Sequence, residues 1–313
     1  MTITYNTVFE DKQYISVARR AAKYFEETAK SAAIPLIIAD EPDSLYYRHT
    51  LFTETKATQG IADKWSPQGE KAFTPHGYED YYLGGKEMHL HVPKGDINHY
   101  KDKGLLADKY DKAIKKFALD VDLMNFIGNY RDQDDRDAYL DAGGLMNQGT
   151  AVTLLNGADS NLATKGYIWK GIKKMVDAPA FRIRESSPPM ILYMSENIAS
   201  VLDAPNRVYQ DMLEKDFIYK TFLSDEAFKG RRIGQIIVTD KILVKGTDTA
   251  GTHDRMILVV PDAAGVARCV SRGFSLLDEE KIMFNVHQAW GYRGALNVFD
   301  DEFVQVSEQI VWT

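Results

Sequence analysis

The sequence is poor in the features that mark several large classes of protein. It has a single cysteine, Cys269, among 313 residues, which excludes an intramolecular disulfide and with it the disulfide-stapled secreted domains. No apolar run approaches the roughly 18 residues that a membrane-spanning helix needs. The N-terminus lacks the charged and apolar regions of a signal peptide. These absences predict a protein of the cytosol, or one assembled there.

The chain also lacks a net positive charge and any familiar catalytic signature. The formal net charge is −7, which argues against a whole-chain attraction to nucleic acid or to an anionic membrane. There is no nucleophile elbow, no phosphate-binding P-loop and no dinucleotide fingerprint, and there is no internal repeat. Hydrophobic residues make up 44% of the chain, enough for a real core in about two domains. We therefore predict no enzymatic activity, no catalytic residue and no cofactor.

The chain does contain one long amphipathic segment, Lys103–Ile127. Its apolar residues recur at spacings of three and four, which places them on one stripe of a 3.6-residue period. They are Leu106, Tyr110, Ile114, Phe117, Val121 and Met124. Gly128 follows at the position of a C-terminal cap. The pattern predicts a helix roughly 38 Å long at 1.5 Å per residue, of the kind that supports an extended molecule.

Lysines give this predicted helix a local positive excess. The three that we single out are Lys109, Lys112 and Lys116. A solvated helix face is one interpretation, and a surface that faces a polyanion weakly is the other. No basic tail or aromatic platform accompanies the lysines, so we expect no tight sequence-specific binding of nucleic acid.

Residues 50–98 alternate turn residues with aromatic residues and offer few positions for a core. The aromatic residues are Trp65, Phe73, Tyr78, Tyr81 and Tyr82. The pattern predicts a long two-stranded excursion. Because isolated hairpins are marginal in water, we expect these aromatic side chains to pack on another subunit or on a ligand. Met88, Leu90 and Val92 alternate with polar residues, which predicts the return strand.

Shorter patterns predict the remaining elements. An arm is expected before a helix at Tyr14–Ala33, whose small apolar face indicates that it lies on another surface. Residues 143–157 are expected to be a loop or weak strand. Ser195 is expected to cap a helix through Leu202. Further helices are predicted at Tyr167–Val176 and Tyr209–Leu223, and strands within 34–42 and at Pro189–Met194, Ile233–Thr239, Met256–Val260 and in a terminal sheet of three strands from Lys281.

His89 and His91 lie on the polar face of the predicted return strand and are the candidates for a metal site. Two imidazoles at i and i+2 can share a metal, and Asp96 lies at the offset of the acidic ligand in a cupin's first motif. The upstream glycine does not fit and no second motif follows, so we interpret these histidines as solvent-facing and predict no metal site. A soluble metalloenzyme that uses this region is the alternative. The strand-like setting of Cys269, VARCVSRGF, predicts a buried thiol.

Taken in order, these segments resemble the major capsid proteins of tailed phages, the Hong Kong 97 phage fold that encapsulin shell proteins share. KGLLADKYDKAIKKFALDVDLMNFIGN resembles the spine helix of that family, and AGGLMNQ resembles the segment after it. PPMILYMSENIASVLDA and RRIGQIIVTDKI resemble parts of the axial domain. FNVHQAWGYRGALNVFDDEFVQVSEQIV resembles the return through the peripheral domain. The resemblance covers most of residues 50–313.

The resemblance implies an α+β fold in four parts. Residues 1–51 would be an N-terminal arm and helix, and residues 52–98 an extended β-hairpin loop. Residues 99–164 and 271–313 would form the peripheral domain, which contains the spine helix. Residues 165–270 would form the axial domain.

The resemblance also implies a function. The chain would be a major capsid protein of a virion, assembled in the host cytoplasm into pentamers and hexamers of an icosahedral shell around double-stranded DNA. An encapsulin-type compartment is the close alternative. The implied partners are other copies of the chain, scaffold, portal and decoration proteins, and packaged DNA through weak non-specific contact, with no membrane. The loop aromatics would contact neighbouring subunits, and Lys109, Lys112 and Lys116 would face the shell interior or a subunit boundary.

Overall fold

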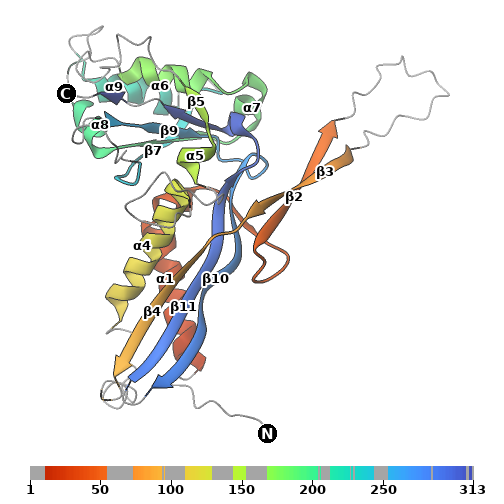
Figure 1. Ribbon diagram of the computed structural model, residues 1–313. Coiled ribbons are helices and arrows are strands. Elements are labelled where there is room, and N and C mark those ends of the chain that lie inside the picture. Colours follow the sequence, from red (N-terminus) through yellow and green to blue (C-terminus); the bar gives the residue numbers. More distant parts are fainter. Residues whose placement is uncertain are drawn as a thin grey trace, which may run out of the picture.

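The computed structural model of the chain describes two packed bodies and a projecting hairpin (Figure 1). The described residues are 11–54, 73–93, 95, 110–128, 144–152, 168–203, 205, 212–225, 227, 230–242, 253–282, 285–307 and 310–311. We call the body built on the two long helices the elongated body, and the body around the five-stranded sheet the five-stranded body. The hairpin leaves the molecule near the junction of the two.

Helix α4, Asp111–Ile127, is the central helix of the elongated body. It buries the predicted stripe, including Ile114, Phe117, Val121 and Met124. Gly128 has φ 80° and donates its backbone N–H to the Met124 carbonyl at 2.8 Å, so the predicted C-terminal cap is confirmed.

The predicted start of this helix was wrong. Tyr110 is its N-cap, with φ −95° and ψ 5°, so the helix begins at Asp111. At 1.5 Å per residue its 17 residues span about 26 Å rather than 38 Å. Apolar spacing gave the buried face correctly, but the backbone at the cap sets where a helix begins. Leu106 and Lys109 lie outside the described residues.

Helix α1, Asp11–Thr28, lies along α4 and is followed by a 3₁₀ turn, η1, at Lys30–Ala33. Its residues at spacings of four are buried: Val17, Ala21, Phe25 and Ala29. They share one apolar cluster with the α4 stripe and with Trp290 and Tyr292 of the sheet. The expectation that this helix only lies on another surface is therefore corrected, since α1 supplies part of the core.

A four-stranded sheet completes the elongated body, in the order β1-β10-β11-β4. Its strands are β1 Leu36–Ile38, β4 Gly85–Pro93, β10 Val266–Ile282 and β11 Asn285–Val298. Only β1 runs parallel to its neighbour within this sheet. Strand β11 unites two of the strands predicted after Lys281. Strand β4 pairs with β11, as at Leu90 with Gln288, so it is not the return strand of the excursion. Its alternation identified a strand but not its partner.

The five-stranded body has the sheet order β5-β12-β9-β6-β7. Its strands are β5 Thr150–Val152, β6 Met190–Met194, β7 Ile233–Val238, β9 Met256–Val259 and β12 Val304–Ser307. Every residue of β6 and β9 is buried, which explains why both read as unbroken apolar runs. Strand β12 lies in this sheet, so the predicted terminal sheet does not hold together as one unit.

Short helices cover this sheet (Figure 1). They are α6 Ile168–Asp177, α7 Phe181–Ser186, α8 Glu196–Val201 and α9 Glu214–Ile218, with the π-helical turn η3 at Tyr219–Leu223. The short helix α5, Leu145–Gln148, lies mainly against α4 and β11 instead. The Ser195 side chain accepts from the Ile198 N–H at 3.2 Å, so the predicted cap of α8 is confirmed. The helix predicted from Tyr209 begins only at Glu214, and α5 replaces part of the expected loop. None of the helices within the described ranges is long and apolar enough to cross a membrane.

A buried carboxylate joins the two bodies. Asp122 of α4 accepts hydrogen bonds from the backbone N–H groups of Lys30 (3.0 Å) and Ser31 (2.9 Å) and from the Ser31 hydroxyl (2.6 Å). It also pairs with the ammonium of Lys241, which follows β7 of the five-stranded body. The chain after α1 is thereby fixed between the bodies.

The hairpin consists of β2, Tyr46–Glu54, and β3, Phe73–Tyr82. The two pair antiparallel from Tyr46 opposite Tyr82 to Glu54 opposite Phe73, with a register shift between Leu51 and Phe52. Among the described elements, β2 and β3 contact chiefly each other. The predicted two-stranded excursion is confirmed, with β3 as its return strand. Small elements complete the chain: η4 Asp301–Phe303, and β8 His253–Asp254 paired with β13 Ile310–Val311.

Candidate assembly surface

The root of the hairpin has two faces, because side chains alternate along each strand. Arg48 and Asp80 lie directly opposite each other on the outer face. The guanidinium donates from Nε to Oδ1 at 2.8 Å and from a terminal nitrogen to Oδ2 at 3.0 Å. These two hydrogen bonds lower the pKa of the Asp80 carboxyl and raise that of Arg48. The pair is a fixed polar centre on this face.

Tyrosines surround that polar centre. The Arg48 guanidinium lies 5.6 Å from the centre of the Tyr78 ring, and Tyr46 and Tyr82 meet edge to face with ring centres 5.7 Å apart. Tyr78 is 64% exposed and Tyr46 54% exposed. Aromatic residues and arginine are the types that dominate binding energy at protein interfaces. We call Tyr46, Arg48, Tyr78, Asp80 and Tyr82 the outer face.

The opposite face of the root packs on the body. The His49 ring stacks parallel on Phe299, with ring centres 4.2 Å apart, and Tyr81 meets Phe299 edge on at 5.1 Å. Tyr47 lies 5.7 Å from the same ring. Burial lowers the pKa of His49, with Glu79 acting in the opposite direction. Burial and the hydrogen bond that the hydroxyl donates to Glu79 at 2.8 Å raise the pKa of Tyr81.

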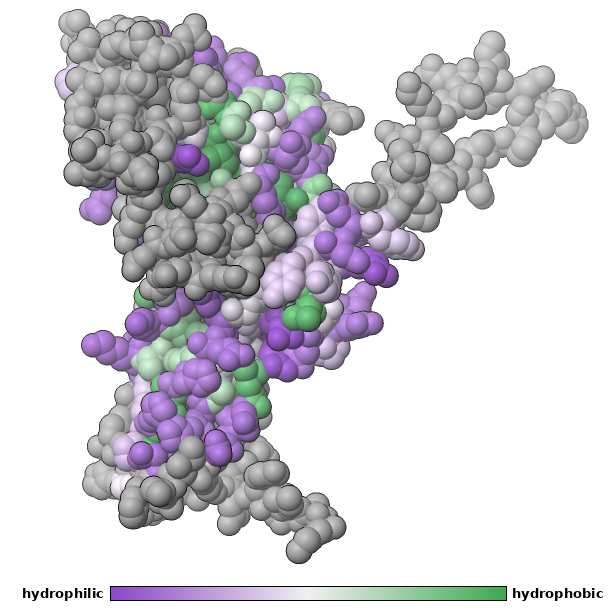
Figure 2. Space-filling model, in the orientation of Figure 1, coloured by the Kyte–Doolittle hydropathy of each residue, from purple (hydrophilic) through white to green (hydrophobic). Residues whose placement is uncertain are grey.

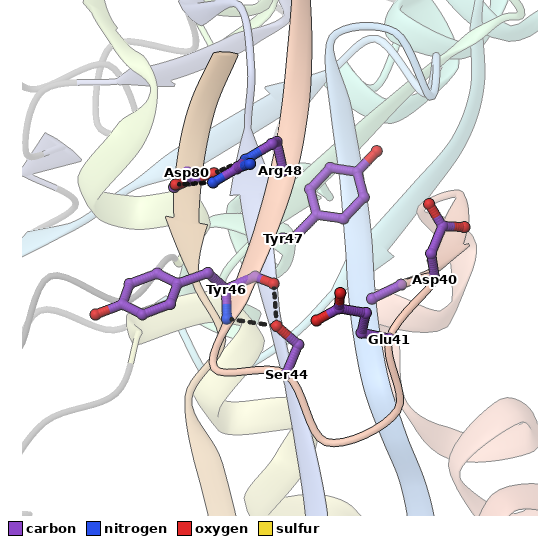
Figure 3. Close-up of a pocket in the computed structure, with 8 residues that line it drawn as sticks. Asp40, Glu41, Ser44, Tyr46, Tyr47, Arg48 and Asp80 are labelled. Carbon is purple, nitrogen blue, oxygen red and sulfur yellow. Dashed lines mark hydrogen bonds and ion pairs between the residues drawn. The ribbon is translucent and has the colours of Figure 1, made fainter.

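A pocket of about 420 Å³ lies between the hairpin root and the loop that precedes it (Figure 3). Its lining residues are Ala39, Asp40, Glu41, Ser44, Tyr46, Tyr47, Arg48 and Asp80. The Ser44 hydroxyl donates to the Tyr46 carbonyl at 2.7 Å and accepts from the Tyr46 N–H at 3.2 Å, which shapes the turn into β2. The lining holds carboxylates, phenols and one guanidinium, with no paired nucleophile and base.

The structure places the five aromatic residues singled out from the sequence in different surroundings. Tyr78 is exposed, Tyr82 lies partly buried beside Tyr46, and Tyr81 packs on Phe299 of its own chain. Trp65 and the side chain of Phe73 lie outside the described residues. The expected lack of intrachain packing therefore fits Tyr78 and does not fit Tyr81.

Sequence reasoning missed several residues of the hairpin root. Tyr46, Tyr47, Arg48 and His49 precede the expected loop, and Phe299 lies far along the chain. The stretch YYRHT, which places one tyrosine on each face of a strand, was the available signal for a strand that contacts something on each side. Nothing local to that stretch indicates Phe299.

Two of the three lysines singled out on the long helix lie among the described residues of α4. Lys112 and Lys116 are exposed on the helix, and Lys109 lies outside the described residues. Between them in the sequence, Lys115 pairs with Asp111 one turn earlier at 2.7 Å and lies 5.5 Å from the centre of the Tyr24 ring. The hydrogen bond with Asp111 raises the pKa of Lys115.

The histidines on β4 are exposed, as the alternation predicted. His89 Nε2 lies 3.8 Å from a Glu87 oxygen, and the His91 ring lies 4.4 Å from that of His287 on the paired strand. Across the part of the chain that the structure describes, no three His, Cys, Asp or Glu side chains are grouped so that they could hold a metal ion. Cys269 is fully buried, as predicted, and burial raises the pKa of its thiol to about 12.

Comparison with known proteins identifies the fold. The chain is similar in structure to the capsid of Myoviridae phage XM1, with TM-score 0.58 and 11% identity over 88% of this chain and 89% of that chain. It is similar to the virus-like particle from Pyrococcus furiosus, with TM-score 0.56 and 11% identity over 94% and 99%.

A third similar structure is the holo-SrpI encapsulin complex from Synechococcus elongatus PCC 7942, with TM-score 0.55 and 12% identity over 100% of this chain and 94% of that chain. No protein-family model and no curated protein matches the sequence. The chain therefore has the α+β capsid fold that its sequence resembles, the Hong Kong 97 phage fold.

Proposed function

We propose that this chain is a major capsid protein, which assembles into pentamers and hexamers of a closed icosahedral shell around double-stranded DNA. The observation that carries the proposal is a hairpin that projects from a chain of capsid fold and exposes tyrosines at its root. A monomeric protein gains nothing from ordering such a hairpin, because an isolated pair of strands is marginal in water. Contact with a second copy supplies the missing stabilisation.

In this proposal the outer face packs on a neighbouring subunit. Covering the surface that Tyr78 still exposes, roughly 100 Å² or more, contributes about 2–3 kcal/mol at about 25 cal/mol per Å². Hydrophilic and intermediate residues dominate the root of the hairpin (Figure 2), so the surface tolerates water before assembly. Tyr81 holds the hairpin on its own chain, whereas Tyr82, Phe73 and Trp65 belong with the intersubunit contact.

In this proposal the elongated body belongs chiefly to the peripheral domain and the five-stranded body chiefly to the axial domain, while β5 and β12, from the ranges expected to be peripheral, lie in the five-stranded sheet. Lys112 and Lys116, with Lys109, face the shell interior or a subunit boundary. Their contact with packaged DNA is weak, independent of sequence and sensitive to salt, because lysine recognises only phosphate charge. Scaffold, portal and decoration proteins are the further partners, the role is structural rather than enzymatic, and the site of action is the virion capsid assembled in a host cytoplasm.

Electron microscopy of the purified protein tests the proposal, together with light scattering and the absorbance ratio at 260 and 280 nm. A capsid protein forms closed megadalton particles when it is expressed with its genomic neighbours, and these carry nucleic acid. Closed particles that hold a co-purifying protein and no nucleic acid would instead identify an encapsulin compartment. Monomers or dimers alone would reject the shell function altogether.

A further inference from the structure

The hairpin is held to the body only at its root, as far as the described residues show. Strands β2 and β3 contact chiefly each other, and the pair extends away from both bodies (Figure 1). From the Tyr46–Tyr82 pair to the Glu54–Phe73 pair the hairpin is about 27 Å long at roughly 3.4 Å per residue. The direction of such a projection depends on the few side chains that hold its root.

One of these anchors is aromatic. Phe299, just after β11, receives His49 in a parallel stack, Tyr81 on its edge and Tyr47 beside it. Its own backbone is fixed, because the Phe299 N–H donates to the Gly265 carbonyl at 2.8 Å. Gly265 in turn leaves no room for a side chain, since a Cβ there would lie 2.1 Å from the Phe303 ring. A rigid turn of the body thus presents a single ring to the inner face of the hairpin.

The second anchor is polar and lies in the loop that enters β2. Asp43 has φ 67°, a left-handed conformation that residues other than glycine rarely adopt. Its carbonyl accepts from Arg293 at 2.7 Å, its N–H donates to the Ser271 carbonyl at 3.3 Å, and its carboxylate pairs with Arg272. An uncommon backbone conformation persists where surrounding contacts over-determine it. Asp43 therefore fixes the loop to β10 and β11.

We propose that Phe299 and Asp43 are positioning residues that set the direction of the hairpin, and through it the angle at which a second copy of the chain docks. The inference rests on the proposed function. A tilt of about 10° at the root would move the far end of a hairpin of this length by about 5 Å, about the spacing between neighbouring strands in a sheet. An interface packed to interior density does not accommodate such a shift.

Two variants weaken the anchors separately. Phe299→Ala removes the ring on which the inner face packs, and Phe299→Tyr retains it as the conservative variant. Asp43→Asn removes the charge that pairs with Arg272 while keeping a residue type that tolerates the left-handed conformation. Tyr219→Ala is the matched control, because Tyr219 is 63% exposed on the five-stranded body, away from the hairpin.

Particle diameter in electron micrographs is the first measurement. Wild-type protein, Phe299→Tyr and Tyr219→Ala should give one narrow size class. Phe299→Ala and Asp43→Asn should give a distribution at least twice as broad, or open sheets, with the subunits still folded by circular dichroism. Normal, uniform particles from both anchor variants would overturn the inference.

The second measurement reports hairpin direction without requiring assembly. One spin label is attached at Tyr78→Cys on the hairpin and the other at Glu87→Cys on β4, so the distance between them reports the direction of the hairpin relative to the body. The buried thiol of Cys269 does not compete for the label. Labelled chains are diluted in unlabelled protein. The electron–electron distance distribution should broaden at least twofold on adding Phe299→Ala, and should not on adding Tyr219→Ala. An unchanged distribution would overturn the inference, and if Phe299→Ala does not fold, Asp43→Asn carries both measurements. A wild-type chain that forms no shells rejects the proposed function, while this distance measurement still decides the inference.

Discussion

The contact of Asp122 with Lys241 gives the sharpest prediction for stability. The carboxylate has no exposed surface, and four donors reach it, from Lys30, Ser31 and Lys241. The substitution Asp122→Asn keeps the shape of the side chain and removes its charge. The amide can still accept at one oxygen, but its NH₂ group now faces donors at the other position.

The expected loss of stability follows from the Lys241 ammonium, which the substitution leaves without its charged partner. Removing one partner of a buried ion pair costs about 3–5 kcal/mol, because the other charge stays without compensation. The Lys241 side chain is 13% exposed, so its ammonium can reach water at some cost in packing. This favours the lower part of the range of about 3–5 kcal/mol. We therefore expect Asp122→Asn to lower the free energy of unfolding by about 3 kcal/mol.

Urea unfolding of the unassembled chain, followed by circular dichroism, measures this loss. The matched control is Asp111→Asn on the same helix, where a partly exposed pair with Lys115 is lost and the expected change is much smaller than for Asp122→Asn. In the double variant with Lys241→Met, the uncompensated charge is gone, so the cost should be smaller than for Asp122→Asn alone. A loss below about 1 kcal/mol for Asp122→Asn, or no rescue in the double variant, would refute the reasoning.

Three further predictions concern the hairpin root and the lysines of α4. Burial lowers the pKa of His49, so the contribution of the neutral ring to stability is complete above about pH 6.5 and is lost as the pH falls through the lowered folded-state pKa. Wild-type protein should therefore lose more stability between pH 7.5 and pH 5 than the His49→Gln variant does, and equal losses would contradict this. Tyr78→Ala should leave the melting temperature of the unassembled chain unchanged and raise the concentration needed for shell formation by at least tenfold, measured by light scattering, since an exposed ring contributes only on association. Replacing Lys112 and Lys116 by Gln should leave particle formation intact and weaken the retention of DNA at raised salt; full particles with unchanged salt stability would show that these lysines have no packaging role.

The elements that could be predicted are those whose buried faces can be recognised from the spacing of apolar residues within a short stretch of sequence. The stripe of α4 repeats every three to four residues because one face of that helix packs on α1 and the sheet. Strands β6 and β9 read as apolar runs because both of their faces are covered. In each case a short window of sequence contains the full physical cause.

Pairing between distant strands has no such local cause. Strand β4 alternates like any half-buried strand, and its pairing with β11 rather than with the outgoing strand β2 depends on residues near 290. The start of α4 at Asp111 likewise depends on the backbone of Tyr110, whose side chain continues the apolar period. Both errors came from extending a correct local pattern beyond the part of the structure that it determines.

The hairpin root shows the same limit at the candidate site. Alternation along YYRHT and YEDYY predicts two faces but does not say which one packs on the body, since both carry tyrosine. Phe299 decides it by stacking on His49, which turns Arg48, Tyr78 and Asp80 outward. The side of the hairpin that we propose as the docking surface is therefore set by a residue far along the chain that never reaches the outer face itself. A change at Phe299 should alter assembly without touching the interface, whereas a change at Tyr78 should alter the interface without moving the hairpin.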